Sequence, residues 1–158
     1  MKFFLLLISV FFIGCKSISK TSDFTYHNID EFDGVLVDEV HYDSQTGVYI
    51  SKSLINDRTL EYKDTKIIVK LPREQLKKLF NLYQSLNISN PNRCIYDKST
   101  RKILSKSVIR FYDDQKKWDD ENCNIDIENK KFINLWSNID KSISSTPEYK
   151  EMFKFIGK

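Results

Sequence analysis

Segments rich in β-branched and aromatic residues lie in the first half of the chain and are separated by turn-forming residues. Residues 34–42 and 48–55 are two such segments, and residues 43–47 between them have the composition of a turn. Gly47 adopts a positive φ without steric cost, which suits the end of a tight connection. The pattern therefore predicts a β-hairpin over residues 34–55.

Other strands are predicted from weaker patterns. They are residues 66–71 and 108–112, with 58–62 as a continuation of the meander and 24–32 as an irregular lead-in. In residues 117–127, Cys123, Ile125 and Ile127 alternate with polar residues, and a period of two indicates a half-buried strand. The polar stretch that carries Cys94 predicts a connection.

Three later segments show the 3.6-residue period of amphipathic helices. Pro72 begins the first, at a position where its missing N–H leaves no hydrogen bond unmade. Residues 145–148, Ser-Thr-Pro-Glu, have the capping-box pattern that begins the third. The three apolar stripes are Leu76, Leu79, Phe80 and Tyr83; Phe132, Leu135, Trp136, Ile139 and Ile143; and Tyr149, Met152, Phe153 and Ile156.

This order of elements predicts an α+β domain. We expect a small antiparallel sheet of about five strands, with two helices on one face and a short C-terminal helix. The 158-residue chain carries a formal charge of +3, and its acidic and basic residues are interleaved without a block of five like charges. The sequence therefore shows no cluster of basic residues of the kind that binds nucleic acid.

The first fourteen residues have the composition of a leader peptide. Lys2 supplies a positive start, and residues 3–13 are apolar apart from Ser9. A run of this length is far below the ~20 residues needed to span a bilayer. Gly14 and Cys15 then follow the apolar run. We therefore expect residues 1–14 to be a signal peptide.

The sequence Phe12-Ile13-Gly14-Cys15 resembles the signal of bacterial lipoproteins, with Phe12 where such signals usually carry leucine. The resemblance implies that Cys15 is lipidated and becomes the new N-terminus, with a flexible tether over residues 15–23 and a single globular domain over 24–158. Ordinary secretion and an uncleaved anchor are the alternatives. The layout is similar to that of small lipoproteins of two-membrane bacteria.

The residue after the lipidated cysteine bears on location within the envelope. Lys16 stands where this class carries aspartate for retention in the inner membrane, so we expect the outer membrane, with the domain facing the periplasm. In that oxidising compartment Cys94 and Cys123 are predicted to form a structural disulfide. A redox or metal pair is the alternative, but neither cysteine lies in a Cys-x-x-Cys motif.

Candidate chemistry is sparse. His27 and His41 are the two histidines, and His41 shares a strand face with Asp43, so this pair is a weak candidate for a base and the carboxylate that orients it. Two Ser-x-x-Lys matches, at 17–20 and 99–102, lack the other blocks of the enzymes that use this motif. No cofactor is predicted.

Two other groupings have simpler interpretations. Acidic residues between 113 and 128 could suggest calcium, but an EF-hand begun at Asp120 would have Ile125 and Lys131 where glycine and glutamate are needed, so no metal site is predicted. Five aromatic residues form the second grouping. They could make a recognition patch, but most aromatic residues are expected to lie in the core. The five are Tyr42, Tyr49, Tyr96, Tyr112 and Trp118.

The sequence leaves three hypotheses for function. The first is a non-enzymatic module, held to a membrane by lipid on Cys15, that binds a protein or peptide. The second is a small envelope hydrolase that uses His41 and Asp43. The third is a structural envelope protein. Absence of a complete catalytic motif favours the first.

Lipidation of Cys15 is directly testable. Cells that express the full chain should incorporate a clickable palmitate analogue into it, and Cys15→Ser, which keeps Cys94 and Cys123, should remain unlabelled because the acceptor thiol is gone. In-gel fluorescence after click coupling measures the label. Equal labelling of the wild type and of Cys15→Ser would contradict the assignment.

Overall fold

Six strands and three helices make up the computed structural model, which describes residues 22–90, 92–100, 102–114, 123 and 126–154. The strands are β1 Phe24–Phe32, β2 Val35–Asp43, β3 Val48–Asn56, β4 Glu61–Ile68, β5 Asn92–Tyr96 and β6 Ile103–Phe111. The helices are α1 Arg73–Leu86, α2 Asp126–Ser144 and α3 Pro147–Phe153.

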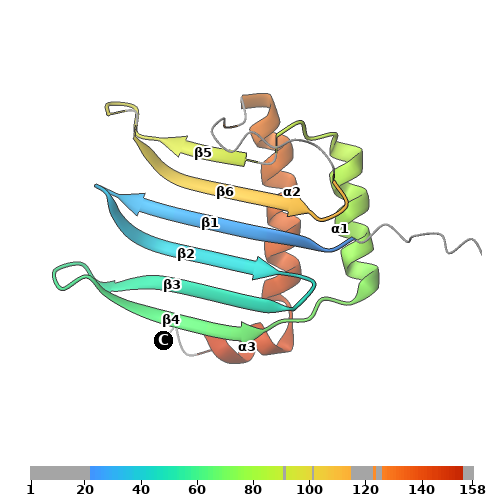
Figure 1. Ribbon diagram of the computed structural model, residues 1–158, viewed down its shortest axis with the longest axis horizontal. Coiled ribbons are helices and arrows are strands. Elements are labelled where there is room, and N and C mark those ends of the chain that lie inside the picture. Colours follow the sequence, from blue (N-terminus) through green and yellow to red (C-terminus); the bar gives the residue numbers. More distant parts are fainter. Residues whose placement is uncertain (1–21, 91, 101, 115–122, 124–125, 155–158) are drawn as a thin grey trace, which may run out of the picture.

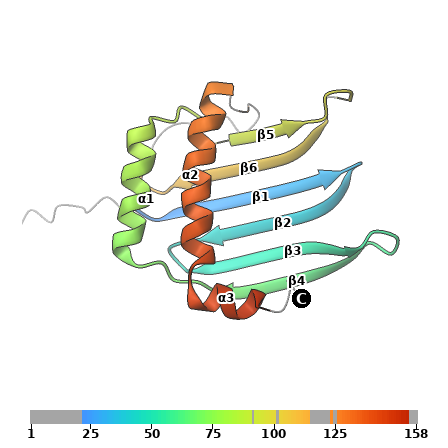
Figure 2. The same cartoon turned by 180° about the vertical axis from the view of Figure 1, so that it is seen from behind.

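The strands form one antiparallel sheet in the order β4-β3-β2-β1-β6-β5, and the helices lie on one face of it (Figures 1 and 2). The predicted α+β class is therefore confirmed, with six strands where about five were expected. Figure 2 shows that the strands extend well beyond the helices at one end. The far end of the helix-side face is thus left without a described helix above it.

The β2–β3 hairpin forms as the sequence predicts. Asp43 Oδ1 accepts the backbone N–H of Gln45 at 2.8 Å, and Gly47 N–H donates to Asp43 O at 2.8 Å. Gly47 has φ 75°, and a Cβ there would lie 3.1 Å from Val69 O. Glycine is therefore required both by the backbone conformation and by the close approach of the following chain.

The hydrophobic core lies between the helices and the nearer half of the inner face of the sheet. Phe24, Tyr42 and Phe111 supply the sheet side and are at most 2 % exposed. Aromatic rings connect the layers, since Tyr83 of α1 stacks on Phe111 with ring centroids 4.7 Å apart. Trp136 of α2 donates its indole N–H to the Tyr26 hydroxyl at 2.6 Å.

All three predicted helices are present. In α1 the residues Leu76, Leu79 and Tyr83 are buried as expected. The α2 stripe is buried at Phe132, Leu135, Ile139 and Ile143, with Trp136 partly buried against the core. Each such apolar side chain contributes roughly 1.5–3 kcal/mol when it leaves water. The N-cap of α3 is Thr146, which accepts from Tyr149 N–H, and Pro147 is in the first turn.

The structure corrects several strand predictions. The irregular lead-in at 24–32 is β1, a nine-residue strand in the middle of the sheet. The two segments 58–62 and 66–71 are replaced by one continuous strand, β4. The stretch around Cys94 is strand β5, and β6 begins at Ile103 rather than 108.

The strand predicted at 117–127 is wrong at its C-terminal end, where Asp126 begins α2. Residues 115–122 and 124–125 lie outside the described residues. Alternation over a few residues does not by itself distinguish a strand from the first turn of an amphipathic helix. A single turn is too short to show the helical repeat of apolar residues.

The predicted disulfide is present. Cys94 of β5 is joined to Cys123, which precedes α2, and the two Cα atoms are 5.5 Å apart. This separation is in the normal range for a disulfide. The bond ties the edge strand β5 to the segment that leads into α2.

Loss of the disulfide should lower stability. It closes a loop between residues 29 apart, so Cys94→Ser should reduce the free energy of unfolding by roughly 3–4 kcal/mol in urea titrations followed by tryptophan fluorescence. The double variant with Cys123→Ser should lose no more than the single one, because both lack the same cross-link. Wild-type stability in the double variant would contradict a structural role.

Candidate functional site

The face of the sheet opposite the helices has no described helix over it, and we call it the open face (Figure 1). Two shallow hollows of about 430 and 470 Å³ lie on it and share His41. Their lining residues are Thr25, His27, Ile29, Glu39, His41, Ile50, Lys52, Asp64, Thr65, Lys66, Lys106, Val108 and Arg110. Apart from Thr65, which the strand register places on the helix side, these residues form rows across adjacent strands.

A pair of histidines occupies the centre of the open face. His27 of β1 and His41 of β2 are cross-strand partners, and their rings meet edge to face with centroids 5.8 Å apart. His27 Nε2 lies 3.0 Å from Glu39 Oε1. Both partners are somewhat more than a third exposed, so this contact contributes little to stability.

Basic side chains surround the histidine pair. The lining of the two hollows contains four basic residues, Lys52, Lys66, Lys106 and Arg110. It contains two carboxylates, those of Glu39 and Asp64. Lys52 Nζ is 4.7 Å from the centre of the Tyr62 ring, which is a cation–π distance. The two hollows together therefore carry a net positive charge above an aliphatic floor of Ile29, Ile50 and Val108.

The predicted pair of His41 and Asp43 lies on this face, but the structure gives the two side chains different neighbours. Asp43 accepts the backbone N–H groups of the β2–β3 turn, whereas His41 packs against His27. The pKa of Tyr112 is raised, mainly by partial burial and to a smaller extent by the nearby Asp43 carboxylate. In the described part of the chain, no hydroxyl or thiol hydrogen-bonds to either histidine.

The remaining sequence candidates fall at scattered positions. Tyr42 and Tyr49 are core residues, whereas Tyr96 and Tyr112 are exposed at opposite ends of the sheet. Ser99 lies in the β5–β6 turn, where its hydroxyl and backbone N–H donate to Asp97 and lower the pKa of that carboxyl to about 2. The segments 17–20 and 118–122 lie outside the described residues.

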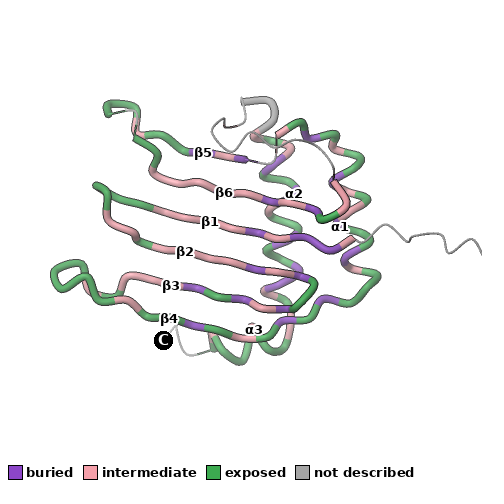
Figure 3. Tube along the Cα trace, viewed as in Figure 1, coloured by how far each residue is buried: buried purple, intermediate pink, exposed green. Residues whose placement is uncertain are grey.

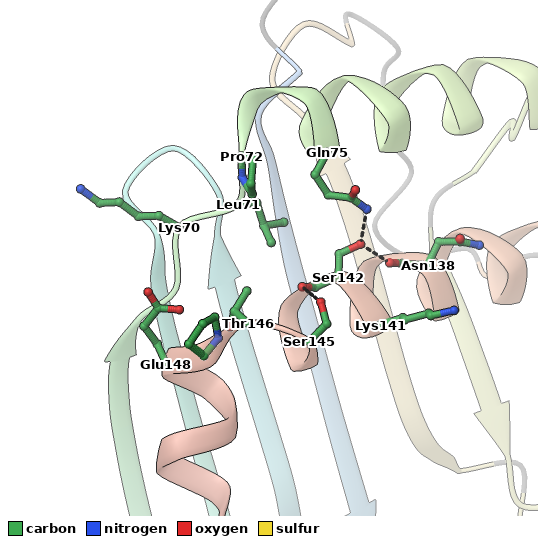
Figure 4. Close-up of a pocket in the computed structure, with 11 residues that line it drawn as sticks. Lys70, Leu71, Pro72, Gln75, Asn138, Lys141, Ser142, Ser145, Thr146 and Glu148 are labelled. Carbon is green, nitrogen blue, oxygen red and sulfur yellow. Dashed lines mark hydrogen bonds between the residues drawn. The ribbon is translucent and has the colours of Figure 1, made fainter.

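A larger hollow of about 550 Å³ lies where the β4–α1 connection meets α2 and α3 (Figure 4). Several of its polar side chains are hydrogen-bonded across or within the helices that line it. Gln75 Nε2 donates to Ser142 Oγ at 2.7 Å, and Ser142 Oγ donates to Asn138 O at 2.6 Å. These bonds join α1 to α2, so we assign this junction a structural role.

Exposed positions lie in the hairpin connections where the strands extend beyond the helices (Figure 3), and several of these residues are apolar. They lie in or beside the hairpin connections β1–β2, β3–β4 and β5–β6, and we call them the apolar rim: Phe32, Ile55, Leu60, Tyr96 and Ile103. Phe32 is 66 % exposed. Leu60 has φ 52°, a conformation that large side chains rarely adopt. Each of the three connections thus presents one or two exposed apolar side chains.

Comparisons add no relative: no protein-family model matches the chain, and no curated protein or solved structure matches it. No described helix is long and apolar enough to cross a membrane. Among the described residues, no group of three histidine, cysteine or carboxylate side chains is arranged to hold a metal ion.

The turn role of Asp43 can be separated from any pairing with His41. Asp43→Ala should lower the free energy of unfolding by about 1 kcal/mol, because two backbone N–H groups lose their acceptor. Asp43→Asn keeps that oxygen and should stay near the wild type, as should His41→Gln. Urea denaturation measures all three, and a loss in His41→Gln as large as in Asp43→Ala would contradict this view.

Proposed function

We propose that the protein is an envelope lipoprotein, held at the outer membrane by lipid on Cys15, whose domain binds an acidic polypeptide on the open face. The observation that carries the proposal is a sheet face that no described element covers, with four basic side chains and two histidines over an aliphatic floor. Such a surface offers both apolar contact and complementary charge.

The arrangement of charges favours an acidic partner. Glu39 and Asp64 lie beside Lys52 as its cross-strand partners, so part of the negative charge is already balanced within the sheet. Lys66 lies one row away, in the row of His41 and Ile50. Carboxylates of a bound segment would therefore meet net positive potential along the row of the histidines.

The apolar rim extends the proposed surface. Phe32 and Ile103 lie at the end of the sheet opposite the start of β1, where the described domain follows the tether (Figure 1). Lipid on Cys15 would thus leave the rim on the side away from the attachment point. A partner that combines carboxylates with a hydrophobic side chain would contact both parts.

A short oligoglutamate peptide tests the charge requirement. About ten residues suffice, because an extended chain rises about 3.3 Å per residue and six strands spaced about 4.8 Å apart span roughly 25–30 Å. We expect saturable binding in fluorescence anisotropy that weakens with added salt. Lys52→Glu combined with Lys66→Glu should weaken it at least about tenfold by reversing two charges.

A matched control uses the exposed side of α1, where Lys77→Glu with Lys78→Glu changes the net charge equally. That variant should bind like the wild type. Equal weakening by both pairs would show attraction to overall charge only and would refute the open face as the site. For native partners, a photo-crosslinking residue at Ile50 should give an adduct that the Lys52/Lys66 reversal removes, whereas Ile133 on α2 should give none.

A further inference from the structure

On the helix side of the sheet, the inward-facing residues change character along the strands. Under the helices they are aromatic or aliphatic, as at Tyr26 and Tyr42. One row further the partners are Asn28 and Val40, and Val40 in turn faces Ser51. The next row pairs Asp30 with Asp38. The inner face thus becomes polar where the helices end (Figure 2).

A cleft of about 320 Å³ lies over this transition, and we call it the inner cleft. Side chains of α2 and α3 form its opposite wall, with Trp136, Tyr149 and Phe153 supplying aromatic surface. Asp140 of α2 lines it as well. Every charged residue that lines the cleft is therefore an aspartate, and aromatic rings lie beside the carboxylates.

Asp30 and Asp38 face each other directly across β1 and β2. Like charges in this arrangement destabilise a sheet, because cross-strand partners have Cβ atoms only about 4.5–5.5 Å apart. Asn28 Nδ2 donates to Asp30 at 3.1 Å and Ser53 Oγ donates to Asp38 at 2.6 Å, but both donors are neutral. Lys63 ends the same row on β4, and no ion pair joins it to either carboxylate in the described chain.

An independent observation is the hydroxyl of Ser51. This residue is 6 % exposed and lines the inner cleft, and its hydroxyl has no hydrogen-bond partner among the described residues. The rest of the residue is covered, but the hydroxyl oxygen itself opens onto the cleft, so it can exchange a hydrogen bond with a polar ligand atom there. It is diagonal to Asp38 on the neighbouring strand.

The electrostatic environment agrees with this geometry. Burial raises the pKa of Tyr26 to about 12, and the charges of Asp140, Asp30 and Asp38 add to the rise. Limited access to water also raises the pKa of the Asp140 carboxyl at the edge of the cleft. The negative charges of the cleft thus act on the Tyr26 hydroxyl, which accepts a hydrogen bond from Trp136.

We propose that the inner cleft binds a primary alkylammonium group. Such a group has three N–H donors, which match the carboxylates of Asp30 and Asp38 and the hydroxyl of Ser51. The adjoining alkyl chain would lie against Trp136 and Tyr149, where aromatic faces attract an organic cation. A free diamine and a lysine side chain share this chemistry. The site is on the side of the sheet opposite the open face and does not depend on it.

Calorimetry on the full-length chain in detergent tests the proposal with 1,5-diaminopentane and its neutral analogue 1,5-pentanediol. We expect one saturable site for the diamine and none for the diol. Asp30→Asn and Asp38→Asn should each weaken binding about tenfold or more, and Ser51→Ala severalfold. The control Asp64→Asn, on the open face, should bind like the wild type.

A second measurement guards against misfolded variants. Without ligand, Asp38→Asn should melt at the same temperature as the wild type or higher, because it removes repulsion between facing carboxylates. A fall in melting temperature would assign the aspartates a structural role and overturn the proposal. Absence of saturable diamine binding up to about 10 mM, or equal binding of the diol, would overturn it too.

The source of the amine is decided by a parallel titration with Nα-acetyl-lysine amide. Tighter binding of this compound than of the diamine would identify a lysine side chain of a polypeptide as the ligand, and the reverse would identify a free amine. In either case the ligand should bind more weakly to Asp38→Asn than to the wild type. Oligoglutamate binding should be unchanged in that variant, so failure at one site is distinguishable from failure at the other.

Discussion

The packing of α2 across the inner face of the sheet is the interaction on which the other features depend. Phe132, Leu135 and Ile139 are fully buried against strands that contribute Phe24 and Tyr42. The strands extend beyond this helical layer at one end, so it covers only part of the inner face (Figure 2). An antiparallel sheet tolerates this arrangement, since one of its faces can meet water.

Side-chain alternation gives the two faces of the same strands opposite character. On β1, His27 points to the open face and Asn28 to the helix side, and on β2, His41 and Val40 divide in the same way. The open face collects lysine and arginine, whereas the inner cleft collects aspartate.

The sequence was informative where a residue's role is local. The α1 and α2 stripes, Gly47 and the Cys94–Cys123 pair each follow from a pattern that short-range chemistry imposes. The sequence predicted β1 only as an irregular lead-in strand, for a physical reason. Its inward positions Asn28 and Asp30 are polar because they lie beyond the helices, so the expected alternation of apolar and polar residues is absent.

The chain by itself therefore determined the helical segments and the turn of the β2–β3 hairpin, because these depend on neighbours in sequence. It also predicted the pairing of Cys94 with Cys123, which the structure contains. Tertiary structure alone decided that β1 lies between β2 and β6. That placement sets His27 beside His41 and Asp30 opposite Asp38. Register between strands fixes such contacts, and a register shift of one residue would exchange the two faces.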